Sequence, residues 1–176
     1  MPDTQKEVKD ELARFFKTGR TKLFQKGEVI IAGELQTTHI YYIDSGFVKG
    51  YTISDEGSYR LLIIKSQSDL IPLANLFDQY SNALFYEAMT DVVVRQVSRP
   101  EFETALAANH QLALATLKKS VMILRDYIER LENLSISDAR QRIIARLLYL
   151  LERFGANSKD NREVIFVPIN YPDLAD

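Results

Sequence analysis

The spacing of hydrophobic residues changes along the chain, and each change marks a different kind of element. At residues 5–18 apolar side chains recur every three or four positions, which predicts a short amphipathic helix that ends before Gly19. From residue 22 to residue 97, short apolar runs alternate with polar turn residues, the pattern of short β-strands. Strands at this spacing predict an antiparallel barrel or roll.

Polar residues and glycines between the apolar runs predict where the strands turn. Gly27 divides the segment LFQKGEVII, and the residues DEGS at positions 55–58 separate two longer runs. A further tight reversal is expected at Thr90–Asp91. Ser98, with an acidic residue three positions later, has the pattern of a helix cap, so a short helix should begin there.

The most regular pattern predicts a long helix from about Asn109 to Leu134. Apolar residues spaced alternately three and four positions apart form the a/d stripe of a coiled coil: Leu114, Leu117, Val121, Leu124, Ile128 and Leu131. This stripe is narrower than the face that a helix usually packs onto its own core. We therefore expect it to pair two chains in a homodimer, with burial on both sides inside one chain as the alternative.

The last part of the sequence predicts three elements. A helix should run from a cap at Ser137 or Asp138 to Gly155, and Val164–Ile169 should form a strand. Asn170 precedes an acidic residue by three positions, which predicts the first turn of another helix.

Composition narrows the chemistry and the compartment. The chain has 176 residues, no cysteine and a formal net charge of −2. Without cysteine, disulfides, thiolate zinc sites and cysteine-ligated iron–sulfur clusters are excluded. No apolar run approaches the length of a membrane span, and the N-terminus lacks the apolar region of a signal peptide. We therefore expect a cytoplasmic protein without a membrane partner.

The sequence offers little for catalysis. It has no glycine-rich phosphate loop, no His-Glu-x-x-His motif and no nucleophile elbow. We therefore expect neither an enzyme nor a cofactor, since a small-molecule hydrolase would need a polar cleft that the sequence does not indicate. Haem ligation by His39 or His110 is an alternative, but a lone histidine is more often a surface or core residue.

Taken in order, the predicted elements resemble the CRP/FNR family of bacterial transcription regulators along the whole chain. LFQKGEVIIAGE at residues 23–34 resembles the family's first hairpin, in which a glycine after a basic residue makes the turn. YYIDSGFVKGY at residues 41–51 resembles a strand pair of its β-roll. NYPDLAD at residues 170–176 resembles the opening of its helix-turn-helix. The order and spacing of the three matches carry the resemblance.

The resemblance implies an α+β fold and a division of the chain into three parts. Residues 1–108 would form a jelly-roll-like antiparallel β-roll (a double-stranded β-helix) that senses an effector. Residues 109–135 would form the dimerisation helix, and residues 136–176 the incomplete N-terminal part of a winged-helix DNA-binding domain.

The resemblance also implies a transcription regulator that binds DNA in a full-length form. The DNA-binding part would begin with Asn170, Tyr171 and Asp173. A homodimer, a small-molecule effector and RNA polymerase are the candidate partners. The alternative is a module of the same fold that mediates protein interaction without binding DNA.

Members of the family that bind cyclic AMP resemble one another in a Gly-Glu pair after the sixth strand and a later Arg-Ser pair. Aligned on this pattern, the chain has Pro72 and Leu73 at the first pair and Asn82 and Ala83 at the second. No arginine occurs in residues 61–94. Because a buried phosphate needs a cation, we expect no binding of cyclic AMP in the usual mode.

An apolar effector pocket remains as an interpretation. Its candidate lining is Ile71, Leu73, Asn82, Ala83, Phe85 and Tyr127. Such a lining would suit a small hydrophobic or aromatic effector. The competing interpretation, that these residues only fill the core, is favoured because aromatic residues usually pack.

Overall fold

A computed structural model describes residues 2–33, 37–73, 84–134, 138–157, 163–165 and 167–169. The chain divides into two compact units, Met1–Val121 and Met122–Asp176. The first unit holds the strands that the short apolar runs predict, and the second holds the helix that follows the long one.

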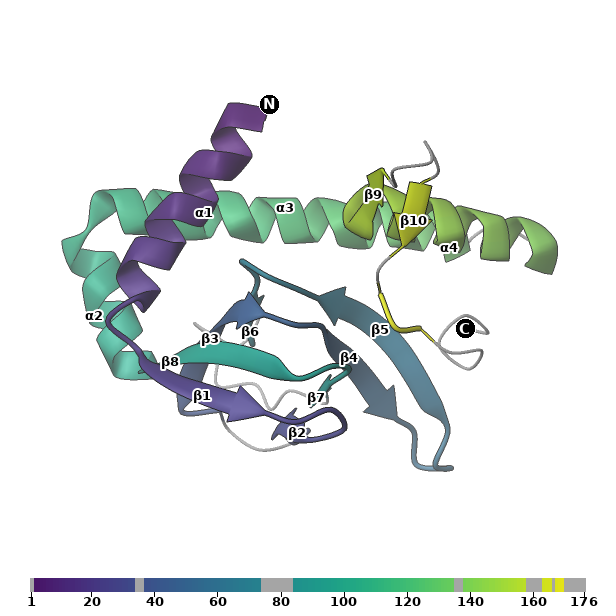
Figure 1. The fold of residues 1–176 in the computed structure, drawn as a ribbon, viewed down its shortest axis with the longest axis horizontal. Helices are drawn as coiled ribbons and strands as arrows, with labels where there is room; N and C mark the ends of the chain where they lie inside the picture. The colour runs from purple at the N-terminus through teal and green to yellow at the C-terminus, as the bar shows by residue number, and fades with distance from the viewer. Residues whose placement is uncertain are drawn as a thin grey trace. The chain divides into compact units, whose positions relative to one another are not determined.

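The described strands of the first unit form two four-stranded antiparallel sheets that face each other (Figure 1). The sheets have the strand orders β1-β8-β3-β6 and β2-β7-β4-β5. The strands are β1 (Arg20–Phe24), β2 (Val29–Ile31), β3 (His39–Ser45), β4 (Val48–Ile53), β5 (Tyr59–Lys65), β6 (Leu70–Ile71), β7 (Phe85–Ala88) and β8 (Val92–Ser98). The predicted antiparallel roll is confirmed.

Several turns carry the chain from one sheet to the other. β1 pairs with β8 and β2 pairs with β7, so the segment around Gly27 is a crossover and not the predicted hairpin. The strands β3 and β4 also lie in different sheets, as do those that flank Thr90–Asp91. Alternation between sheets lets both contribute an inner face to one core. The predicted turn at residues 55–58 does close a hairpin, because β4 pairs with β5.

Two of the crossovers use a glycine in the left-handed region, Gly27 with φ +87° and Gly46 with φ +92°. A Cβ at Gly46 would collide with the carbonyl oxygen of Asp91, whereas a Cβ at Gly27 would have nothing within 4 Å. The two positions therefore share a backbone requirement and differ in the space around them.

Replacing Gly27 with alanine is expected to lower the free energy of unfolding by about 1–2 kcal/mol, the cost of the left-handed backbone. Gly46→Ala should cost clearly more, because the backbone must also move away from Asp91. Urea unfolding of both variants measures the difference. Equal losses would contradict the close approach at Gly46.

The inner faces of the two sheets form the first core cluster. Its buried residues are Phe24, Ile30, Ile31, Tyr41, Ile43, Val48, Ile63, Ile71, Tyr86, Ala88, Val92 and Val94.

A second core cluster joins helices to the β1-β8-β3-β6 sheet. The helices are α1 (Pro2–Phe16), α2 (Arg99–Ala108) and the first part of α3 (His110–Leu134). Its buried residues are Val8, Leu12, Phe16, Ile40, Tyr42, Leu70, Val97, Phe102, Leu112 and Ala115. The helix predicted at residues 5–18 is present but begins at Pro2 and ends at Phe16, and its apolar face lies in this cluster.

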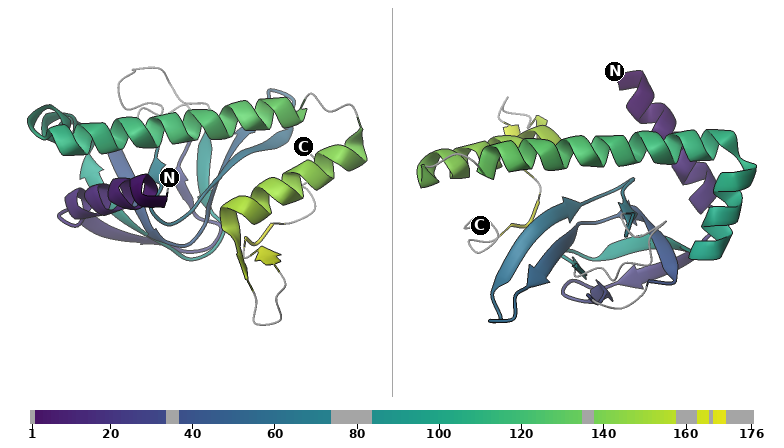
Figure 2. Two further views of the ribbon diagram at one scale, coloured as in Figure 1. Left: turned by 90° about the horizontal axis from the view of Figure 1, so that it is seen from above. Right: turned by 180° about the vertical axis from the view of Figure 1, so that it is seen from behind.

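Capping side chains mark the residue at which each later helix begins. The Ser98 hydroxyl accepts a hydrogen bond from the backbone N–H of Glu101 at 3.3 Å, as the sequence pattern predicts. α2 then carries the chain at a steep angle from β8 to α3 (Figure 2). The Asn109 side chain accepts from the backbone N–H of Leu112 at 3.1 Å, and α3 covers the predicted range.

The second unit contains α4 (Ala139–Phe154), capped by Asp138 and ended at Gly155 as predicted. β9 (Gly155–Asn157) pairs antiparallel with β10 (Glu163–Ile165). The prediction of a strand over Val164–Ile169 is wrong in extent, since β10 ends at Ile165 and residues 167–169 are not in a strand. A proline at position 168 cannot donate to a ladder, which limits the strand. β9 was not predicted.

Candidate functional site

The six predicted a/d residues lie on α3 and are exposed on the single chain. We call Leu114, Leu117, Val121, Leu124, Ile128 and Leu131 the α3 stripe. Leu114 is 37% exposed and the other five are 50–66% exposed. Elsewhere on the helix, Leu112, Ala115 and Thr116 are buried. A continuous apolar row in water is typical of a surface that another molecule covers. The α3 stripe is therefore a candidate pairing surface.

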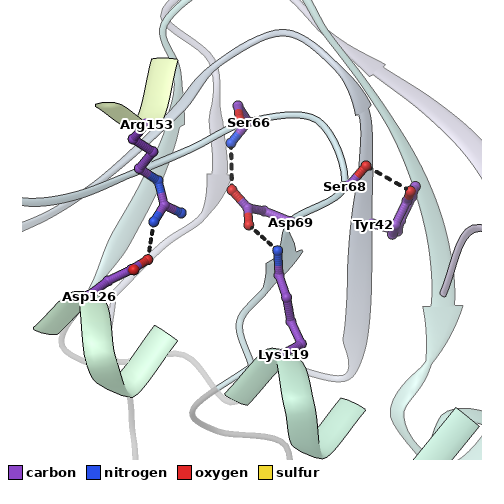
Figure 3. Close-up of polar contacts among 7 residues, drawn as sticks. All are labelled: Tyr42, Ser66, Ser68, Asp69, Lys119, Asp126 and Arg153. Carbon is purple, nitrogen blue, oxygen red and sulfur yellow. Dashed lines mark hydrogen bonds and ion pairs between the residues drawn. The ribbon is translucent and has the colours of Figure 1, made fainter. Parts of the chain in front are cut away.

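An ion pair joins α3 to the roll on a different face of the helix. Lys119 Nζ lies 2.7 Å from Asp69 Oδ1, and the two side chains are 12% and 5% exposed (Figure 3). The other carboxylate oxygen of Asp69 accepts a hydrogen bond from the backbone N–H of Ser66 at 2.9 Å. Both charges are nearly buried, so each one depends on the other to offset the cost of leaving water. Removing either charge would leave the other buried without this partner.

Hydrogen bonds to β3 fix the loop that carries Asp69. The backbone N–H of Ser68 donates to the Ile43 carbonyl at 2.9 Å, and the N–H of Ile43 donates to the Asp69 carbonyl at 3.0 Å. The Tyr42 hydroxyl donates to Ser68 Oγ at 3.2 Å. Burial raises the pKa of Tyr42, so this hydroxyl stays protonated at neutral pH. The loop leads directly into β6, and so toward Pro72 and Leu73.

Of the predicted pocket residues, the described ones of the first unit are Ile71, Leu73 and Phe85, and they make separate contacts there. Ile71 is buried in the first core cluster, whereas Leu73 packs against the second. Phe85 stacks on Tyr51, with ring centroids 5.4 Å apart. Tyr127 belongs to the second unit, and Asn82 and Ala83 lie outside the described residues.

Side chains of the roll itself fill its inner face near Gly50. A Cβ at Gly50 would lie 3.3 Å from the ring of Tyr86, and the cross-strand partner Ile63 is buried. Lys65 pairs across strands with the core residue Val48, so it lies on the same inner face, and it is only 3% exposed. Lys65 was not predicted as a site residue, although it ends the apolar run of β5.

A charged and aromatic cluster links β4, β5 and β7. Lys49 Nζ lies 2.9 Å from Glu87 Oε1 and 5.4 Å from the ring centroids of Tyr51 and Tyr59. Burial, with a smaller contribution from Glu87, raises the pKa of Tyr51. These contacts hold neighbouring strands together. The charged and aromatic side chains of the cluster interact with one another.

The remaining candidates from the sequence are the two histidines and the start of the predicted DNA-binding part. The His39 ring nitrogen Nδ1 lies 2.8 Å from the Thr38 hydroxyl, and His110 begins α3. Among the described residues, no three metal-binding side chains cluster. None of the described helices has the length and apolar character needed to cross a membrane. Asn170, Tyr171 and Asp173 lie outside the described residues.

The roll and α2 define the class of protein. The family model for the cyclic nucleotide-binding domain matches residues 21–109, and the chain belongs to this family. A sequence search among curated proteins finds no match.

Solved structures of regulators share this fold. FixK2 from Bradyrhizobium japonicum is 20% identical, with a TM-score of 0.75 over 89% of this chain and 75% of FixK2. CprK, solved as a complex with OCPA, is 19% identical, with a TM-score of 0.68 over 94% of this chain and 75% of CprK. The catabolite activator protein of Thermus thermophilus is 21% identical, with a TM-score of 0.61 over 82% of this chain and 68% of that protein. The chain is thus structurally similar to CRP/FNR-type regulators, and the likeness concerns the fold.

Proposed function

We propose that the chain is the sensing and pairing part of a transcription regulator of the CRP/FNR type. In this proposal the roll responds to an effector, and α3 joins two chains through the α3 stripe. The DNA-reading part begins at residues 170–176. The observation that carries the proposal is the stripe itself, an apolar row at heptad spacing that is 37–66% exposed.

Pairing through α3 gives the proposal its physical logic. A two-fold axis along the stripe would relate two DNA-reading parts, and a symmetric DNA site offers them two equivalent half-sites. A change in helix pairing would alter the distance between the two DNA-reading parts, and thus how well they fit the two half-sites. The ion pair between Asp69 and Lys119 supports this proposal, because it joins the roll to α3.

Selection of DNA tests this function. The chain, extended by whatever its reading frame encodes after Asp176, should select duplexes with two symmetric half-sites from a random pool. Their centres should lie about 34–36 Å apart, or a multiple of one helical turn. Recovery of no symmetric site would contradict the proposal and favour a module of this fold that mediates protein interaction.

We also propose that the effector is not cyclic AMP bound in the usual mode. At the positions that align with the Gly-Glu pair, Pro72 has no backbone N–H to donate, and the side chain of Leu73 has no oxygen to accept a hydrogen bond from a ribose hydroxyl. Tyr86 and Ile63 occupy the inner face beside Gly50. A lysine at position 65 supplies a charge but not the two-pronged donor that arginine offers a phosphate.

Calorimetric titration of the chain with cyclic AMP is therefore expected to give no measurable heat of binding. An affinity in the micromolar range would contradict this expectation. Repeating the titration with Lys65→Met would then show the cause, since loss of that binding would identify Lys65 as the cation of the phosphate.

A further inference from the structure

α1 passes beside the first turns of α3 within the first unit (Figure 2). An open groove of about 450 Å³ lies between the two helices, and its α3 wall includes Leu114 and Lys118. Leu114 is the first residue of the α3 stripe and is 37% exposed. The groove is therefore continuous with the surface that we propose to pair two chains.

The heptad register places the groove on one flank of the α3 stripe. With Leu114 at position a, Lys118 occupies position e and Ala113 occupies position g. In a parallel two-stranded coiled coil, position e of one helix faces position g of the other. When two chains pair through the α3 stripe, the partner's Ala113 therefore comes to lie beside Lys118, at the groove.

α1 brings negative charge to this flank of α3. In many coiled coils a long charged side chain at position g pairs with position e of the other helix. Here position g holds an alanine, and Glu7 Oε2 of the same chain lies 3.9 Å from Lys118 Nζ. Asp10 and Glu11 also line the groove, and Arg14 adds one more cation, so three carboxylates face two cations. A small uncharged residue fits such a groove, whereas a further carboxylate would be repelled.

We propose that the groove between α1 and α3 is part of the pairing surface and receives the first turns of α3 from a second copy of this chain. Each α1 then packs beside the partner's Ala113, so that four helices meet at this end of the pair. The α3 stripe is short for a pairing surface, and the groove enlarges the area that two chains bury. The inference rests on the proposed function, because it assumes pairing through the α3 stripe.

Substitution of Ala113 tests this arrangement, because a pair made by the two α3 helices alone would respond in the opposite sense. In such a pair, Ala113→Glu would place a carboxylate opposite the partner's Lys118 and strengthen the dimer. In the proposed groove, the same glutamate would meet the carboxylates of α1, so the dimer dissociation constant should rise about tenfold or more. Sedimentation of the full chain over a range of concentrations measures this constant.

Two control variants separate charge from position and from size. Ser120 occupies the next g position, one heptad along α3, and does not line the groove. Ser120→Glu should therefore not raise the dissociation constant. Ala113 is half-buried in the single chain, so a long side chain there could also disturb its own surroundings. Ala113→Lys has a similar length and the opposite charge, and it should weaken the dimer less than Ala113→Glu does.

An unchanged or lower dissociation constant for Ala113→Glu would overturn the place of α1 in the pairing surface. Equal weakening by Ala113→Glu and Ala113→Lys would overturn it as well, because size and not charge would then be the cause. In both cases the unmodified chain would still be a dimer, and the proposed function would stand. A monomeric unmodified chain would instead contradict the proposed pairing through the α3 stripe, and this inference with it.

Discussion

Replacing Val121 and Leu124 with glutamate is expected to leave the chain monomeric. Both residues are more than half exposed in the single chain and lie at the middle of the α3 stripe. In a two-fold pair each glutamate would face its own copy, so four like charges would enter an apolar seam. Light scattering should report a fall from twice the chain mass of 20.2 kDa to that mass.

A control separates pairing from a general effect of charge on the surface. Leu23 of β1 and Ile53 of β4 are also exposed apolar residues, but they lie outside the stripe. The Leu23→Glu, Ile53→Glu double variant should remain a dimer. The account would be contradicted if Val121→Glu, Leu124→Glu kept the mass of the unmodified chain, or if the control variant dissociated equally.

Phe16→Ala is expected to lower the free energy of unfolding by about 3–5 kcal/mol, the usual cost of removing a buried aromatic ring. Phe16 is fully buried where α1 meets the sheet and α2. Its ring stacks on Tyr42 at 5.5 Å between centroids and lies 5.3 Å from the ring of Phe102. Without it, the cluster that joins three elements would hold a cavity.

Urea unfolding measures this loss, with Leu23→Ala as the control. Leu23 is 73% exposed, so its removal should change the free energy of unfolding by no more than about 0.5 kcal/mol. If Phe16→Ala cost as little as Leu23→Ala, the packing of α1 on the β1-β8-β3-β6 sheet would be wrong.

Helices were predictable from the sequence because their signals are local. The spacing of the α3 stripe, the cap at Ser98 and the cap at Asp138 all lie within a few residues of the element that they define. The structure accordingly confirms these helices nearly to the residue.

Strand partners were less predictable because the same turn can join paired strands or strands of opposite sheets. The segment around Gly27 reads as a hairpin, yet Leu23 pairs with Val93, seventy positions away. Nothing within the segment distinguishes the two outcomes, since either one needs a tight turn between two apolar runs.

The site shows the same division between local and distant signals. The α3 stripe follows from spacing alone, whereas the Asp69–Lys119 pair joins a turn to a helix fifty residues later. A charged residue in a turn, such as Asp69, is ordinarily expected to be solvated. Its buried partner becomes evident only from the packing of the loop in the structure. Leu73 separates from Ile71 because β6 ends at Ile71, so strand alternation no longer places both on one face.

Cysteine cross-linking tests the pairing of two chains through α3 most directly. The chain has no cysteine, so Leu124→Cys gives one thiol per chain. A parallel two-fold pairing places residue 124 beside its own copy, within reach of a disulfide. The account predicts that mild oxidation converts Leu124→Cys into a covalent dimer, while Leu23→Cys on β1 remains a single chain. If Leu124→Cys also remained a single chain under that oxidation, the central claim would be contradicted.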